Sequence, residues 1–153
     1  MVKSGVRYCS MFIGEYHHAL DEKGRMALPT KFRAALSHGC VVTRGIDQCL
    51  SVYTMEEWKT LAEKLAALPL AQANSRAFSR LMLAGAMDAE PDKQGRIVLP
   101  DYLRTYAKLE KNVVVVGLYN RLEIWNKGTW ETYKQGTEAA STDIAEQLHE
   151  LGV

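Results

Sequence analysis

The sequence lacks any run of about eighteen apolar residues, so no membrane-spanning helix is expected. The first ten residues contain Lys3 and Arg7, but no apolar stretch follows them, which argues against a secretory signal peptide. We therefore interpret residues 1–10 as an N-terminal extension, with Met11 as an alternative start. A cytoplasmic protein with no membrane partner is expected.

Cysteine is scarce and does not occur in close pairs. The three cysteines, Cys9, Cys40 and Cys49, are odd in number and form no C-x-x-C motif, so we expect free thiols in a reducing compartment. His17 and His18 are adjacent, and on a strand they would face opposite sides. The sequence therefore predicts no metal site and no cofactor.

The motifs of common enzyme mechanisms are absent as well. There is no glycine-rich phosphate loop, no nucleophile–base set and no metal-ligand spacing. Asp21 and Asp92 occupy equivalent positions in an internal repeat and would be the candidates for a pair of acid–base carboxylates. Without a supporting nucleophile or phosphate loop, this pair does not predict catalysis, and we expect a protein that is not an enzyme.

An internal repeat is the most informative feature that the sequence does contain. The segment DEKGRMALP at residues 21–29 returns as DKQGRIVLP at residues 92–100, an offset of 71 residues. The match extends to Arg33 with Arg104 and, after a one-residue insertion, to Trp58 with Trp130. We divide the rest of the chain into a first repeat (11–70), a connecting helix (71–82), a second repeat (83–136) and an acidic tail (137–153).

Each repeat is predicted to contain a hairpin, a short helix, a second hairpin and a further helix. Asp-x-x-Gly is typical of a type I turn closed by a glycine with positive φ, and Pro29 and Pro100 suit the first turn of a helix. In the first repeat we expect strands over 16–20, 25–28, 40–44 and 50–53 and helices over 30–36 and 54–68. In the second we expect strands over 83–90, 96–99, 112–117 and 122–125 and helices over 101–107 and 127–135, the latter shorter than its counterpart over 54–68. The fold class is therefore mixed β/α, mostly β.

About sixty residues is near the lower limit for an independent core, so we expect the two repeats to pack as one pseudo-symmetric unit. Strand edges left open by this arrangement favour oligomerisation.

The Asp-x-x-x-Arg motif, present once in each repeat, is the candidate functional feature. Asp21 and Asp92 are expected to brace their turns, and a two-stranded ribbon ending in basic residues fits the DNA major groove, where arginine pairs well with guanine. The candidate DNA-binding residues are Lys23, Gly24, Arg25, Lys93, Gly95 and Arg96, and the candidate phosphate contacts are Lys31 and Arg33. An alternative is that the Asp–Arg pairs only brace turns.

Charge is unevenly distributed along the chain. From Glu131 onward the formal charge is −4, which leaves +5 on residues 1–130, since the whole chain carries +1. A basic body with an acidic tail is compatible with DNA binding.

The paired motifs within a duplicated frame resemble the MraZ family of transcriptional regulators. The resemblance covers residues 11 to about 135 and is carried by MFIG at 11–14, the two motif segments, and RLMLAG at 80–85. It implies two tandem AbrB-like swapped-hairpin β-barrel halves and a ring-shaped homo-oligomer. It also implies a nucleoid-associated regulator that binds repeated promoter boxes upstream of the division and cell-wall gene cluster. Arg25, Arg96, Lys23 and the neighbouring turn residues would face DNA.

Two further expectations concern the regions around the motifs. The lead-in to the second motif, residues 87–91, is acidic and contains Pro91, so we favour the first repeat as the stronger DNA reader. In the tail, Ile144, Leu148 and Leu151 indicate a short amphipathic helix that packs against another subunit. The alternative function is a protein-interaction module of antitoxin-like fold.

Overall fold

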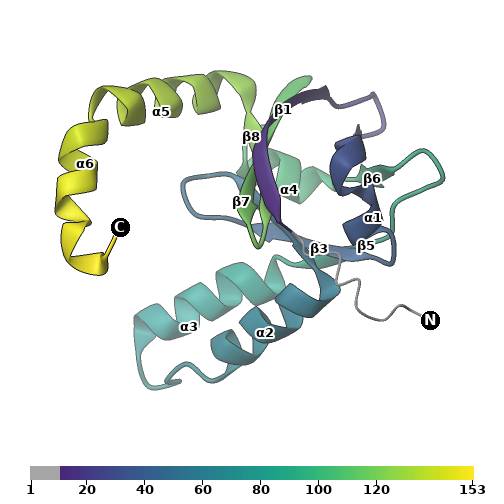
Figure 1. Cartoon of the computed structure of the whole chain (residues 1–153). Helices are drawn as coiled ribbons and strands as arrows, with labels where there is room; N and C mark the ends of the chain where they lie inside the picture. The colour runs from purple at the N-terminus through teal and green to yellow at the C-terminus, as the bar shows by residue number, and fades with distance from the viewer. Residues whose placement is uncertain (1–10) are drawn as a thin grey trace, which may run out of the picture.

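The computed structural model describes residues 11–153, which form one six-stranded antiparallel sheet and a separate two-stranded ribbon (Figure 1). The strands are β1 (Phe12–Ala19), β2 (Arg25–Ala27), β3 (Cys40–Arg44), β4 (Leu50–Thr54), β5 (Met87–Ala89), β6 (Arg96–Val98), β7 (Asn112–Tyr119) and β8 (Leu122–Asn126). The large sheet has the order β1-β7-β8-β4-β3-β5, and β2 pairs with β6 in the ribbon.

Short helices follow the ribbon strands, and longer ones follow the second hairpin of each repeat. The helices are η1 (Thr30–Phe32), α1 (Arg33–Leu36), α2 (Met55–Ala66), α3 (Ala73–Ser79), the π-helical η2 (Arg80–Ala84), α4 (Asp101–Tyr106), α5 (Lys127–Ala139), α6 (Ser141–Gln147) and η3 (His149–Leu151). None of the helices in this described part is long and apolar enough to cross a membrane.

The two repeats are interleaved rather than placed side by side. Within residues 11–153, only the β3–β4 and β7–β8 hairpins pair within a repeat, whereas β1 pairs with β7, β2 with β6, β4 with β8 and β5 with β3. After the first turn the arms separate, and a single bridge between Leu20 and Met26 joins them. This exchange of strands is the swapped-hairpin arrangement, and the fold is mixed α/β, consistent with a duplicated AbrB-like fold.

The predicted barrel is not closed. The outer strands of the large sheet are β1, which spans eight residues, and β5, which spans three, and they do not pair with each other. The strand predicted over 83–90 is shortened because residues 83 and 84 belong to η2. Pro91, which follows, has no backbone N–H to continue a ladder. A three-residue edge strand cannot match the eight-residue strand at the other edge.

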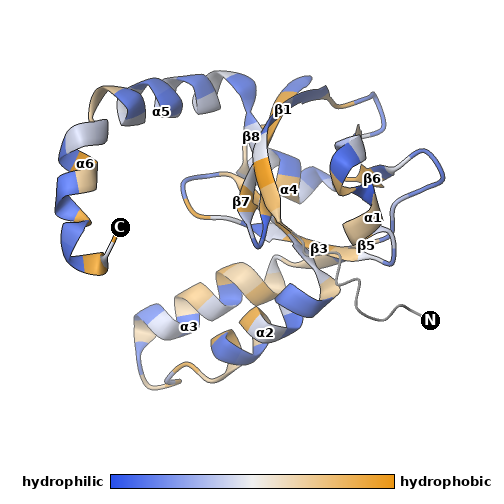
Figure 2. Ribbon diagram, viewed as in Figure 1, coloured by the Kyte–Doolittle hydropathy of each residue, from blue (hydrophilic) through white to orange (hydrophobic). Residues whose placement is uncertain are grey.

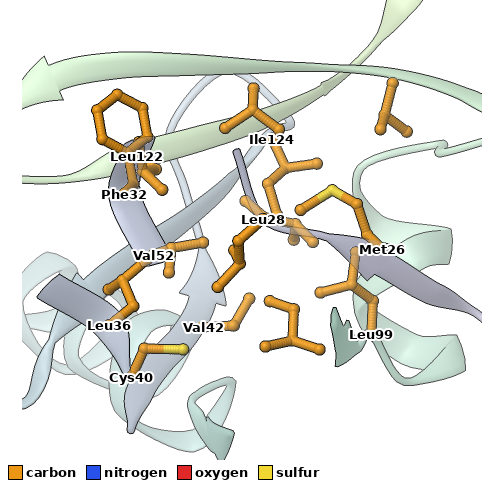
Figure 3. Close-up of a cluster of buried hydrophobic side chains, with 14 of the residues drawn as sticks. Met26, Leu28, Phe32, Leu36, Cys40, Val42, Val52, Leu99, Leu122 and Ile124 are labelled. Carbon is orange, nitrogen blue, oxygen red and sulfur yellow. The ribbon is translucent and has the colours of Figure 1, made fainter. Parts of the chain in front are cut away.

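Both repeats contribute to the main hydrophobic core. It lies between the large sheet, the ribbon and the short helices α1 and α4, and its side chains interdigitate across the repeat boundary (Figure 3). Met26 and Leu28 from the first repeat and Ile97 and Leu99 from the second are all at most 1% exposed. Because the core is shared, neither set of strands encloses it alone.

Helices α2 and α3 form an antiparallel pair beside the sheet (Figure 1). The Thr54 hydroxyl caps α2 by accepting a hydrogen bond from the Glu57 amide (3.1 Å). On α2, Leu65 is 4% exposed, and Trp58 packs on Tyr53 with ring centroids 5.8 Å apart. These apolar side chains of α2 therefore serve packing.

The second long helix differs from the prediction. Helix α5 spans 13 residues, against 12 for α2, although it was expected to be the shorter. Pro69 follows closely behind α2, whereas no proline follows Pro100 in the sequence, so nothing of that kind stops α5. Helix α6 and η3 continue from α5 as an exposed arm in which Ile144 and Leu148 are each 39% exposed.

Candidate nucleic-acid interface

The first Asp-x-x-x-Arg segment folds into a tight turn held by its own side chains. The Gly24 amide donates to the Asp21 carbonyl (3.0 Å), and Gly24 has a φ of +74°, a conformation that favours glycine. Asp21 Oδ1 accepts hydrogen bonds from the backbone amides of Lys23 and Arg25, both at 2.9 Å, and Oδ2 accepts from Arg25 Nε at 2.6 Å. One carboxylate thus orders both the loop and the arginine.

The second turn repeats this geometry. Asp92 Oδ1 accepts from the amides of Gln94 and Arg96 at 2.9 Å, and Oδ2 accepts from Arg96 Nε at 2.9 Å. Gly95 has a φ of +76°. The two copies of the motif therefore build the same local structure despite Gln94 standing where the first turn has Lys23.

Both turn carboxylates are strong hydrogen-bond acceptors with lowered pKa values. The pKa of Asp21 lies below its ordinary value of 3.8, mainly because the backbone amide of Arg25 donates to the charged form, with the Arg25 side chain and the Lys23 amide adding to the effect. The pKa of Asp92 is lowered in the same way by Arg96 and the Gln94 amide. Both groups are therefore negatively charged at neutral pH.

Each of the two turn arginines has hydrogen-bond donors that its aspartate does not use. The bond to Asp21 uses only Nε of Arg25, and neither terminal amino group of Arg25 has a hydrogen-bond partner within residues 11–153. The same holds for Arg96 in that part of the chain. The two side chains are 30% and 29% exposed, so an external acceptor can reach them.

The turns lie at opposite ends of the ribbon. Arg25, the first residue of β2, pairs with Val98, the last residue of β6, and Arg96, the first residue of β6, pairs with Ala27, the last residue of β2. Because each turn comes just before its own ribbon strand, the two turns lie at different ends of the ribbon. Both turns project from the side of the molecule that carries β6 and α1, and both are hydrophilic (Figures 1 and 2).

Contacts across the repeat boundary hold each turn. The Leu28 amide donates to the Gly95 carbonyl, and the Leu99 amide donates to the Gly24 carbonyl, both at 2.8 Å. Arg33 lies against Gly95 and Arg104 lies against Gly24. The sequence predicts a phosphate contact for Arg33 and assigns no role to Arg104, although the equivalence of the two arginines in the repeat is a usable signal.

A groove of about 710 Å³ lies beside the first turn. Its charged lining comprises Asp21, Glu22, Lys23, Arg25, Arg104, Glu110 and Lys111. The Lys111 carbonyl accepts a hydrogen bond from the Leu20 amide (2.8 Å), which fixes the loop before β7 against the turn. Lys111 was not anticipated from the sequence, because only the strand exchange brings this second-repeat loop to the first turn.

The two remaining candidate lysines are both exposed. Lys31 lies in η1, and Lys93 lies in the second turn.

The described cysteines are buried. Cys40 and Cys49 are free thiols, and burial raises the pKa of Cys40 to about 11. Cys9 lies outside the described residues. Among residues 11–153 there is no group of three or more His, Cys, Asp or Glu side chains that could hold a metal ion.

The sequence matches the profile of the family described as "MraZ protein, putative antitoxin-like" twice, over residues 11–81 and 82–151. The chain belongs to the MraZ family. Proteins named transcriptional regulator MraZ are 50% identical in Natranaerobius thermophilus, 47% in Caldanaerobacter subterraneus subsp. tengcongensis and 50% in Pediococcus pentosaceus. Each match covers 143 residues, 94% of this chain and 100% of the relative.

MraZ membership agrees with the internal repeat, because each profile match contains one Asp-x-x-x-Arg turn. The MraZ relatives are named as transcriptional regulators, which is not an enzyme class.

Proposed function

We propose that this protein regulates transcription by binding double-stranded DNA through its two Asp-x-x-x-Arg turns. The observation that carries the proposal is the geometry of Arg25 and Arg96, each fixed at Nε by an aspartate while its terminal amino groups stay without a partner in the described part of the chain. Two donors at the end of an oriented guanidinium match the O6 and N7 acceptors of guanine in the major groove.

The neighbouring residues fit the other requirements of such an interface. Gly24 and Gly95 keep the turns tight, and the exposed Lys23, Lys93 and Lys31 are suited to phosphate oxygens, which position a protein on DNA without reading its sequence.

The first turn is proposed to be the stronger reader. Its groove contains Lys111 together with Glu110 from the second repeat, whereas the corresponding loop beside the second turn, Ser37–Gly39, contains no lysine. Asp88 and Glu90, which precede the second turn, repel phosphate. These differences favour unequal contributions of the two turns.

We propose the DNA target and the subunit assembly that the family resemblance implies. The protein would act at the nucleoid as a ring-shaped homo-oligomer on repeated boxes upstream of the division and cell-wall gene cluster. A single turn contacts few base pairs, so several turns engaging spaced boxes would gain affinity through effective concentration. The unpaired outer edges of β1 and β5 and the exposed apolar arm leave surfaces for subunit contacts.

The test is a titration of the protein against its own upstream DNA and an unrelated duplex at two salt concentrations. Wild-type binding to its own DNA should be tight and should weaken steeply with salt. Arg25→Ala should remove about 1–3 kcal/mol, roughly 5- to 150-fold, per engaged site, while circular dichroism and oligomeric state stay unchanged. Lys59→Ala, an exposed substitution on α2, is the control and should bind as wild type.

Two outcomes would contradict the proposal. If Arg25→Ala unfolds or dissociates, the Asp–Arg pair only braces the turn. If the wild type binds both duplexes equally and weakly, the protein-interaction module of antitoxin-like fold becomes the better hypothesis.

A further inference from the structure

We propose that Arg33 and Arg104 are positioning residues, each of which holds the DNA-reading turn of the opposite repeat. The inference rests on the proposed function of the turns and assigns a role to two arginines outside them. Each arginine acts on a turn about sixty residues or more away in the sequence, so each turn depends on a side chain of the other repeat.

The contact between Arg33 and the second turn is close. A methyl group added at Gly95 would lie 2.5 Å from Arg33 Nε and 2.6 Å from its Cδ, so the arginine stem packs directly on the turn glycine. Arg33 Nε donates to the Leu28 carbonyl at 2.9 Å, and the Leu28 amide donates to the Gly95 carbonyl at 2.8 Å. The guanidinium is thereby fixed beside Leu28, which is itself hydrogen-bonded to the second turn.

The contact of Arg104 with the first turn is its pseudo-symmetric counterpart. A methyl group added at Gly24 would lie 3.0 Å from Arg104 Nε. Arg104 Nε donates to the Leu99 carbonyl, and the Leu99 amide donates to the Gly24 carbonyl, both at 2.8 Å. The recurrence of all these contacts in a duplicated frame separates this arrangement from incidental packing.

The contacts of Arg33 assign it a positioning role, because its Nε donates to a backbone carbonyl and its stem lies against a glycine of the turn. Its terminal amino groups, like those of Arg25, have no hydrogen-bond partner within residues 11–153, so DNA binding must separate positioning from phosphate contact. A turn held in one conformation presents Arg96 without the entropy loss of ordering it during binding. Lysine lacks the Nε donor and the planar group, so it cannot replace arginine here.

Amide hydrogen exchange in the oligomeric protein tests the coupling directly. In Arg33→Ala, the amides of Gln94 and Arg96, which both donate to Asp92, should exchange several-fold faster than in wild type. The pKa of Asp92 should rise toward its ordinary value as those bonds weaken. The turn at 21–25 should not change. Arg104→Ala should give the mirror image, so each variant is the control for the other.

DNA binding separates positioning from phosphate contact. Arg33→Ala should lose about two- to tenfold in affinity for its own upstream DNA with an unchanged salt dependence, and Arg33→Lys should not restore it. A phosphate contact would instead lower affinity for both duplexes, reduce the slope of log K against log salt by about 0.9 per contact, and be restored by lysine.

Failure of this inference can be told from failure of the proposed function. If the wild type does not discriminate its own DNA, the function fails, yet the exchange measurement still tests the coupling. Loosening of the turn in the same repeat, of both turns equally, or of neither would overturn the inference. If Arg33→Ala does not fold, Arg33→Lys keeps the charge and the bulk of the side chain, and the same exchange pattern applies to it.

Discussion

At the scale of single residues, Asp21 and Asp92 organise the site. Each accepts two backbone amides and one arginine Nε, and these bonds require the charged carboxylate. The motif itself indicated this local arrangement, because every partner lies within four residues. The accessibility of the arginine ends was not deducible, since it depends on what the rest of the chain leaves uncovered.

The lowered pKa values of these aspartates predict a pH dependence. A carboxylate with a folded pKa below its unfolded one adds stability above the unfolded value and loses that contribution as pH falls through the folded value. Asp92→Asn should therefore be less stable than wild type at neutral pH. This gap should narrow as the pH falls below about 3.9. Urea unfolding of both proteins along a pH series measures it, with Asp143→Asn in the exposed arm as control; a gap independent of pH would refute this cause.

At the scale of elements, most helices and strands followed from local patterns. The β3–β4 and β7–β8 hairpins, helix α2 and the two glycine turns all form where the sequence predicts them. Two elements differ in length from the prediction, one because a neighbouring helix takes its residues and one because no proline ends it. Strand β5 is short because η2 takes its first residues, and α5 is long because no proline stops it.

The backbone conformations of two glycines predict opposite effects on stability when each is replaced by alanine. Gly95→Ala should destabilise the protein by at least about 1–2 kcal/mol from its positive φ alone, with an added loss from displacing Arg33. Gly136→Ala, in helix α5, where the added methyl meets nothing within 4 Å beyond its chain neighbours and the nearby helix backbone, should stabilise it by roughly 0.5–1 kcal/mol. Denaturant midpoints compare the two variants. Equal effects of the two substitutions would show that the turn conformation is not required.

At the scale of the whole molecule, the exchange of strands makes the repeats interdependent. The ribbon contains one strand from each repeat, and the buried core includes Met26 and Ile97 packed in a single cluster. The same exchange brings Lys111 to the first turn and Arg33 to the second. The candidate interface is therefore a product of both halves.

This interdependence predicts the behaviour of isolated halves. Residues 11–82 or 83–153 alone should not form a stable monomer, because each would expose the core face of its strands and leave its ribbon strand unpaired. Each half should be unfolded or should self-associate, with two copies replacing the missing partner. Circular dichroism with analytical ultracentrifugation distinguishes these states. A half that unfolds cooperatively as a monomer would contradict the prediction.

The sequence by itself determined the features that depend on neighbours in the chain. These are the duplication, the tight turns, the aspartate–arginine bonds and the type of most elements, because turn and helix chemistry acts over a few residues. Tertiary structure decided which strands pair, why the sheet stays open, and which arginine holds which turn. Those outcomes depend on contacts between segments about 45 to 110 residues apart, where strand lengths and shared burial select the partner and local propensity carries no information.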